Sequence, residues 1–151
     1  MTNWEPGVGV VELPDGRLVR GRGLHAHPAS DFQTPEFGVY LLGRTVHPGP
    51  WEHRFVRWPD FGVPLSTPHA MRALCEAYDR AAEERVELGC AGGTGRTGAG
   101  LAVLAALAGV EPDRAVAWVR EHYRARAVET PWQERWVVRA AERAIERRSA
   151  G

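Results

Sequence analysis

Two reactive side chains, Cys90 and Arg96, lie six positions apart and are joined by a loop rich in glycine. In a short loop of this kind, successive backbone N–H groups can all point into one concavity. Such concavities at helix N-termini bind anions. An arginine beside them can bind two oxygens of a phosphate at once. The sequence therefore predicts a phosphate site formed by Arg96 and the five residues before it: Ala91, Gly92, Gly93, Thr94 and Gly95.

The position of Cys90 favours a nucleophilic role. It follows a predicted strand, 85–88, and precedes an apolar stretch, 98–108, that is typical of a helix. A helix N-terminus and a nearby guanidinium both favour the ionised form of a thiol. The chemistry that fits is attack of a thiolate on a phosphomonoester through a phosphocysteine intermediate. A glycine-rich turn that merely carries a core cysteine is the alternative, whereas a Walker A loop is excluded because no Gly-Lys-Ser/Thr follows.

Transfer of a phosphoryl group to sulfur expels an oxygen that needs a proton from a general acid. Asp60 lies thirty residues upstream, in the loop Trp58-Pro-Asp-Phe-Gly-Val-Pro64, after another predicted strand. Ligands of parallel sheets bind beyond the carboxyl ends of the strands, so the two loops can lie side by side. Alone, Asp60 could be an acidic turn residue; beside the cysteine loop, it is the predicted general acid.

The elements that must position these loops alternate between strand and helix along the chain. This order predicts the α/β class, with three layers and a central, largely parallel (mixed) β-sheet flanked by helices. A hairpin over 8–24 can add an antiparallel edge. Further strands are expected at 37–42, 54–57 and 85–88, and helices from Pro68 onward, at 98–108, at 112–126 and at 131–148.

Length and composition limit the number of domains, the class of partner and the location of the protein. The 151 residues predict one domain over 1–151, with the hairpin and first strands in 1–50 and the chemistry-bearing motifs in 51–151. Nineteen arginines balance nineteen acidic residues, which argues against nucleic acid as a partner. The absence of lysine is typical of a GC-rich bacterial genome. With no signal-like N-terminus and no long apolar run, we expect a cytoplasmic monomer without a membrane partner.

Taken together, two motifs make the chain resemble the cysteine-dependent protein tyrosine phosphatase superfamily, including its small bacterial tyrosine and dual-specificity members. The segment Cys90-Ala-Gly-Gly-Thr-Gly-Arg-Thr-Gly98 is similar to the family's phosphate-binding loop. The segment Trp58-Pro-Asp-Phe-Gly-Val-Pro64 is similar to its mobile acid loop. A third stretch, Val128-Glu-Thr-Pro-Trp-Gln133, resembles the family's glutamine loop less specifically.

The resemblance implies a role for each matching residue. Cys90 would be the nucleophile, Arg96 the phosphate clamp and Asp60 first the general acid and then the general base. Thr97 would donate a hydrogen bond to the sulfur and ease its departure. Gln133, with Glu129, would position the hydrolytic water. No metal or cofactor is implied, because backbone dipoles and Arg96 carry the charge stabilisation.

The expected substrate is a phosphotyrosine-containing protein, and the site should also take phosphate, sulfate and tungstate. Tyrosine-only and dual specificity remain open. Two further alternatives are a phosphate-binding pseudophosphatase that does not turn over and a phosphatase of a non-protein substrate, such as a phosphoinositide, an inositol phosphate or a phosphorylated RNA end. The lysine-free phosphate loop argues against the inositol substrates.

Several positions depart from the family pattern or lie outside it. Gly89 stands where most members have a histidine, so we expect weaker activation of the thiol. Glu129 replaces a common glutamine and is expected to face away or to pair with Arg124 or Arg126. Core packing is the favoured role for Cys75 and for the pair Trp132 and Trp136. His25 and His27 lack further residues spaced to complete a metal site.

Overall fold

The structure, a computed structural model, describes residues 3–26, 28 and 32–150. Five strands form one sheet in the order β1-β2-β5-β3-β4. They are β1 (Val10–Glu12), β2 (Leu18–Gly23), β3 (Phe37–Leu42), β4 (Glu52–Arg57) and β5 (Val86–Cys90). Only the β1–β2 pair is antiparallel, and the other three pairs are parallel. The predicted mixed, largely parallel sheet with a hairpin at its edge is confirmed.

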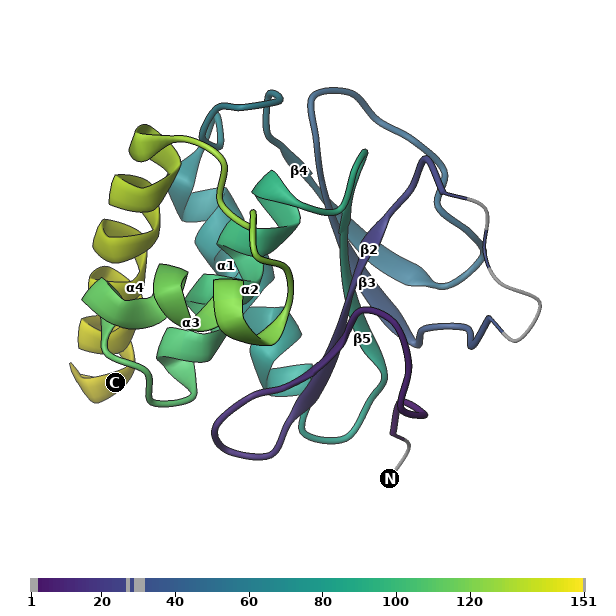
Figure 1. The fold of residues 1–151 in the computed structure, drawn as a ribbon, viewed down its shortest axis with the longest axis horizontal. Helices are drawn as coiled ribbons and strands as arrows, with labels where there is room; N and C mark the ends of the chain where they lie inside the picture. The colour runs from purple at the N-terminus through teal and green to yellow at the C-terminus, as the bar shows by residue number, and fades with distance from the viewer. Residues whose placement is uncertain (1–2, 27, 29–31, 151) are drawn as a thin grey trace.

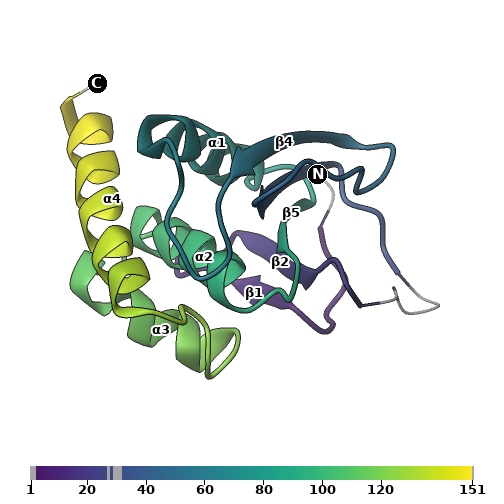
Figure 2. The same ribbon diagram turned by 90° about the horizontal axis from the view of Figure 1, so that it is seen from above.

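The helices lie together on one face of this sheet (Figures 1 and 2). They are α1 (Thr67–Arg80), α2 (Gly95–Leu107), the short 3-10 turn η1 (Pro112–Arg114), α3 (Ala115–His122) and α4 (Pro131–Ala150). Helix α2 is buried along almost its whole length, between the sheet and the other helices. Its apolar sequence, rich in alanine, suits this central place, because small side chains let neighbouring elements approach closely.

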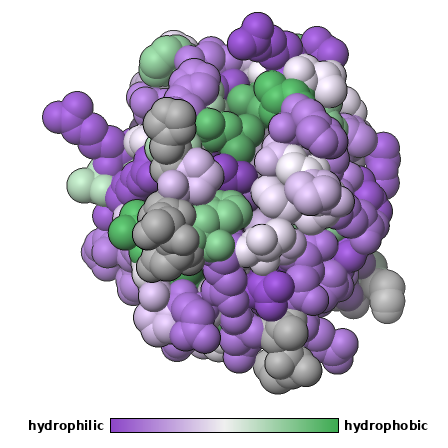
Figure 3. All heavy atoms as spheres, turned by 90° about the vertical axis from the view of Figure 1, so that its right-hand side faces the viewer, coloured by the Kyte–Doolittle hydropathy of each residue, from purple (hydrophilic) through white to green (hydrophobic). Residues whose placement is uncertain are grey.

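Connecting segments, not helices, form the layer on the opposite face of the sheet (Figure 1). The outer surface of this side shows hydrophobic atoms between larger hydrophilic areas (Figure 3). Beneath it, Trp4 and Phe32 stack on the guanidinium of Arg20 at 4.1 and 4.4 Å. The flanked sheet is therefore confirmed, with its helices concentrated on one side.

A buried carboxylate organises the loop-covered face. Glu87 of β5 is fully buried and accepts hydrogen bonds from the guanidinium groups of Arg20 and Arg22. The hydroxyl of Tyr40 also donates to it, at 2.6 Å, and the indole N–H of Trp51 donates to the Tyr40 hydroxyl. Because buried charges are tolerated only when they are paired and hydrogen-bonded, this network fixes β5 against β2 and β3. Burial and the nearby Glu87 charge raise the pKa of Tyr40, which keeps it a donor.

Two predicted helix boundaries were wrong. The helix expected over 112–126 is a 3-10 turn followed by α3, which ends at His122. It stops there because Tyr123 and Arg124 turn towards the glycine-rich loop and bond to it. The helix expected from residue 98 begins at Gly95, inside the loop. Among the described residues, no helix is long and apolar enough to cross a membrane.

Candidate active site

The glycine-rich loop connects the end of β5 to the start of α2, at the edge of the sheet predicted from the sequence. Its first two carbonyl groups are held by the backbone that follows β2. The N–H of Leu24 donates to the carbonyl of Cys90 at 2.8 Å, and the N–H of His25 donates to that of Ala91 at 3.0 Å. The pairing of β2 with β5 therefore continues past the last residues of both strands.

The next two carbonyl groups are held by side chains that follow α3. The hydroxyl of Tyr123 donates to the carbonyl of Gly93 at 2.5 Å, and Nη1 of Arg124 donates to that of Gly92 at 2.9 Å. The same Nη1 also donates to Oγ1 of Thr94. Sequence reasoning missed these bonds, because it placed both residues inside the helix expected over 112–126 and considered Arg124 only as a partner of Glu129.

These four bonds decide which way the loop's N–H groups point. In a planar trans peptide, the C=O of one residue and the N–H of the next point in opposite directions. Since the carbonyls of residues 90–93 all bond to groups outside the loop, the N–H groups of residues 91–94 point to its other side. That of Gly93 donates to the Cys90 sulfur at 3.2 Å. The loop thus has the predicted anion-binding shape around the sulfur.

A glycine is required at residue 93 for this shape. Its φ of +78° is a left-handed conformation, and a Cβ there would lie 2.5 Å from the backbone nitrogen of Gly23. Any side chain would therefore separate the loop from the end of β2.

We predict that Tyr123→Phe weakens oxyanion binding without removing the fold. The phenylalanine ring still fills the space beside Gly21, where a Cβ would meet the Tyr123 ring at 2.6 Å. The bond to Gly93 is lost, and one such bond contributes about 1 kcal/mol, so affinity for tungstate should fall roughly fivefold. Calorimetric titration of tungstate checks this, with the distant Tyr78→Phe as the matched control. Equal affinity in Tyr123→Phe and the unsubstituted protein would contradict the positioning role.

Thr97 lies close to this loop in the first turn of α2, but one expected contact is absent. Its hydroxyl is fully buried and has no hydrogen-bond partner among the described residues. The predicted bond to the Cys90 sulfur is therefore not present in this structure, in which the N–H of Gly93 bonds to that sulfur instead. An unsatisfied buried hydroxyl costs about 1–3 kcal/mol.

The acid loop and the phosphate loop meet through Arg96. This guanidinium is almost fully buried; Nη1 donates to the carbonyl of Trp58 at 3.0 Å, and Nη2 lies 3.4 Å from Oδ1 of Asp60. The side chain of Asp60 itself is 59% exposed. The two loops paired from the sequence therefore do meet, although β3 lies between β4 and β5 and the ends of these two strands are not adjacent.

Helix α4 supports the acid loop from the other side. The indole N–H of Trp132 donates to the carbonyl of Phe61 at 2.6 Å, and Nε2 of Gln133 donates to that of Gly62 at 3.0 Å. The buried ring of Trp58 packs edge-on against Trp136, with ring centroids 4.9 Å apart. A core role for Trp132 was wrong, because its side chain is half exposed at the loop.

Gln133 is buried and bridges two loops. Its Oε1 accepts from the backbone N–H groups of Glu129 and Thr130, at 2.8 and 3.3 Å. With its Nε2 bonded to the acid loop, the amide ties the glutamine-loop segment to the loop of Asp60. In this arrangement Gln133 acts as a structural link, and its predicted role with water stays a prediction.

Glu129 does not form either of the ion pairs expected for it. No ion pair with Arg124 or Arg126 occurs in the described part of the chain. The side chain instead lies against the phosphate loop, where its Oε1 is only 2.0 Å from the place a Cβ on Gly95 would occupy. A side chain at residue 95 would displace this carboxylate, which stands beside the predicted anion site.

We predict that Glu129→Gln increases affinity for oxyanions. A like charge near a dianion costs about 1 kcal/mol at 4 Å in water, so its removal should lower the inhibition constant of tungstate about two- to fivefold at neutral pH. Inhibition of aryl phosphate hydrolysis measures this, with exposed Glu121→Gln as the control. An unchanged or weaker affinity in Glu129→Gln would show that the carboxylate does not act on the bound anion.

Tyr40 occupies the space next to Gly89, the position at which the resemblance implied a histidine. A Cβ on Gly89 would lie 2.9 Å from Cδ1 of Tyr40. The glycine thus makes room for the ring that bonds to Glu87. Weaker activation of the thiol remains a prediction.

A cavity of about 640 Å³ opens beside the two loops. It is bordered by Asp60, Ala91 and Arg96 and extends to the ends of β2 and β3. Leu24, Leu42, Val46 and Pro48 contribute apolar surface to its lining. Besides Arg96, its basic residues are Arg22, His25, Arg44 and His47.

No cluster of three or more metal-ligating side chains occurs in the part of the chain that the structure describes. His25 lines the cavity beside the phosphate loop. His27 lies outside the described residues.

Comparison with known proteins identifies the family. The sequence profile of the protein-tyrosine phosphatase domain matches residues 32–141, almost three quarters of the chain. The chain belongs to the protein-tyrosine phosphatase family. It has the mixed α/β fold of its structural relatives. The family assignment inferred from the two motifs is confirmed.

One curated relative matches part of this chain. An uncharacterized protein of Methanocaldococcus jannaschii, MJ0215, is 37% identical over 84 residues, which are 56% of this chain and 52% of that protein. The chain thus spans about half the length of this curated relative.

Two solved structures share the fold. The active form of Tk-PTP has a TM-score of 0.64 at 24% identity, over 88% of this chain and 97% of that one. A kinase associated phosphatase with its catalytic cysteine replaced by serine has a TM-score of 0.59 at 14% identity, over 73% and 71%.

Proposed function

We propose that this phosphatase hydrolyses phosphotyrosine through a phosphocysteine intermediate, with Cys90 as nucleophile and Asp60 as general acid and base. One observation carries the proposal: Arg96 bonds to the acid loop while it lies in the phosphate loop that surrounds the Cys90 sulfur. The nucleophile, the anion donors and the acid are thus brought together by a single buried cation.

In the first step, the thiolate of Cys90 attacks phosphorus and the P–O bond to the leaving group breaks. The inward N–H groups and Arg96 stabilise the charge on the phosphoryl oxygens. Protonated Asp60 donates its proton to the leaving oxygen, so that a neutral phenol departs.

In the second step, water attacks phosphorus and the P–S bond breaks. The Asp60 carboxylate accepts the proton of that water, and the thiolate is restored together with inorganic phosphate. The unpartnered hydroxyl of Thr97 can donate to the departing sulfur. Gln133, held 3.0 Å from the acid loop's Gly62 carbonyl, keeps that loop in place during both steps.

The cavity beside the loops supports an aryl ester as substrate. Its apolar residues, among them Leu24, Leu42 and Val46, can contact the ring that carries the phosphate. A phosphoserine would leave much of this apolar lining uncovered. The exposed residues Arg44 and His47 at its border can contact acidic residues next to the phosphotyrosine.

The test is metal-free hydrolysis of p-nitrophenyl phosphate across about pH 4 to 9, followed by matched phosphotyrosine, phosphoserine and phosphothreonine peptides. We expect turnover in the presence of a chelator and a clear preference for phosphotyrosine. Equal rates on all three peptides would assign dual specificity. Binding of tungstate without any turnover would assign a phosphate-binding module, and preference for a phosphoinositide would assign a non-protein substrate.

A further inference from the structure

A second cavity lies between α1 and α4. Its volume of about 510 Å³ is within the range of small-ligand sites, about 300–1,000 Å³. It is separate from the cavity beside the phosphate loop, because the two share no lining residue. We call it the α1–α4 groove; its lining is Thr67, Pro68, Met71, Arg72, Cys75, Arg143, Ala144, Glu146, Arg147 and Arg148.

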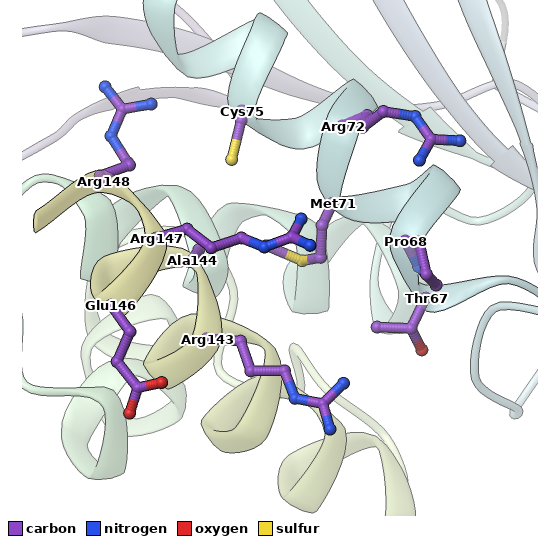
Figure 4. A pocket seen from close by; sticks show the side chains of 10 residues that line it. All are labelled: Thr67, Pro68, Met71, Arg72, Cys75, Arg143, Ala144, Glu146, Arg147 and Arg148. Carbon is purple, nitrogen blue, oxygen red and sulfur yellow. The ribbon is translucent and has the colours of Figure 1, made fainter. Parts of the chain in front are cut away.

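The inner wall of the groove is apolar and includes two flexible or polarisable sulfur-containing side chains. Met71 and Ala144 are buried at its base, and Cys75 is half-buried beside them. Figure 4 shows the sulfur of Cys75 pointing into the space between the two helices, with Met71 below it. A methionine adapts its shape to irregular apolar ligands more easily than branched side chains do.

The border of the groove carries an excess of positive charge. Four arginines and one glutamate line it. Arg148 is paired with Asp79 at 2.8 Å. For Arg72, Arg143 and Arg147, no ion pair occurs among the described residues. By contrast, arginines elsewhere on the surface, such as Arg54 and Arg80, each contact more than one glutamate.

The orientation of these cations favours an anion at the mouth. In Figure 4, Arg147 extends across the groove from α4, while the carboxylate of Glu146 points away from it. Guanidinium groups bind carboxylates through two parallel hydrogen bonds, and they bind most strongly where an apolar wall excludes water. A ligand that fits must therefore combine one anionic group with an apolar body.

We propose that the α1–α4 groove binds a small amphipathic carboxylate, with its anionic group at Arg143 and Arg147 and its apolar chain against Met71 and Cys75. This site is independent of the proposed catalytic reaction. At one end of the groove, Thr67 accepts a hydrogen bond from Trp136 at 3.1 Å, and Trp136 packs on Trp58. A bound ligand would thus touch the layer that supports the acid loop.

The chain offers a direct probe of this site. It has two cysteines, so in the Cys90→Ser protein the only thiol is that of Cys75, inside the groove. Burial raises the pKa of this thiol, so alkylation by iodoacetamide should be followed at mildly alkaline pH. We expect octanoate to slow alkylation saturably, about tenfold at ten times its dissociation constant, while 1-octanol has little effect.

Variants in which one arginine is replaced by glutamate test whether the protection depends on the groove or on the charge of the whole surface. Arg147→Glu should abolish protection by octanoate, when each variant is compared with its own rate without ligand. Arg114→Glu, an exposed site on η1 outside the groove, changes the net charge equally and should keep full protection. The proposal is overturned if octanoate gives no protection, if 1-octanol protects equally, or if both variants lose protection alike. Protection by phosphatidylglycerol vesicles alone would also overturn it, in favour of a membrane surface.

Discussion

Replacing Cys90 by serine should abolish hydrolysis of aryl phosphates while binding of tungstate persists. The serine hydroxyl is close in size to the thiol but is not ionised near neutral pH, so no nucleophile remains. Loss of a covalent nucleophile typically lowers kcat by more than about 10³-fold. The carbonyl bonds that orient the loop do not involve the side chain of residue 90, so the anion site should stay formed.

The measurement is a pair of assays on the same preparation: p-nitrophenyl phosphate hydrolysis and calorimetric titration with tungstate. Circular dichroism controls for folding. Activity of Cys90→Ser within tenfold of the unsubstituted protein would refute the covalent mechanism. Loss of both activity and tungstate binding in a folded protein would instead place an essential part of the anion site on the sulfur itself.

Replacing Asp60 by asparagine should lower the rate about 10²–10⁴-fold for substrates with poor leaving groups. Asparagine keeps the shape of the side chain but cannot donate the proton that an alkoxide or phenoxide needs. A leaving group that is already stable as an anion needs little protonation, so the loss should be smallest there. Asp60 is 59% exposed and lies 3.4 Å from Arg96, which also bonds to the carbonyl of Trp58, so the fold should not depend on the carboxylate.

A series of aryl phosphates with graded leaving-group acidity measures this dependence. We expect a steeper dependence of rate on leaving-group acidity in Asp60→Asn than in the unsubstituted protein. Exposed Asp113→Asn, on η1, is the matched control and should follow the unsubstituted series. A uniform loss across the whole series would show that Asp60 orients the loop and does not transfer the proton.

These experiments depend on an acid loop that is held from two sides. Arg96 bonds to it from the phosphate loop, Trp132 and Gln133 bond to it from α4, and Trp58 packs on Trp136. Arg96 and the supporting residues of α4 lie more than thirty residues apart along the chain. The position of Asp60 in the folded protein is therefore a property of the tertiary structure as a whole.

Local patterns were sufficient for most of the fold. The turn signal Pro14-Asp-Gly16 favoured the hairpin expected over 8–24. Ser66 or Thr67 was a possible cap for the helix expected from Pro68 onward; the cap is Ser66, whose side chain accepts a hydrogen bond from the N–H of His69. Such signals are readable because a turn or a helix cap is formed by neighbours in sequence. The end of α3 was misplaced for the opposite reason, since Tyr123 and Arg124 leave the helix to bond with residues about thirty positions away.

The sequence by itself determined the chemistry: a thiol, a glycine-rich loop, an arginine and a distant acid, in an order and spacing that few other functions require. Only the tertiary structure decided how the loop is oriented, because its four carbonyl bonds come from the end of β2 and from the residues after α3. It also placed Glu129 at Gly95 and Tyr40 at Gly89, where the sequence showed only unusual residues. The residue types and their spacing show which chemical groups the chain carries. Hydrogen bonds and close contacts between remote segments exist only once the chain has folded.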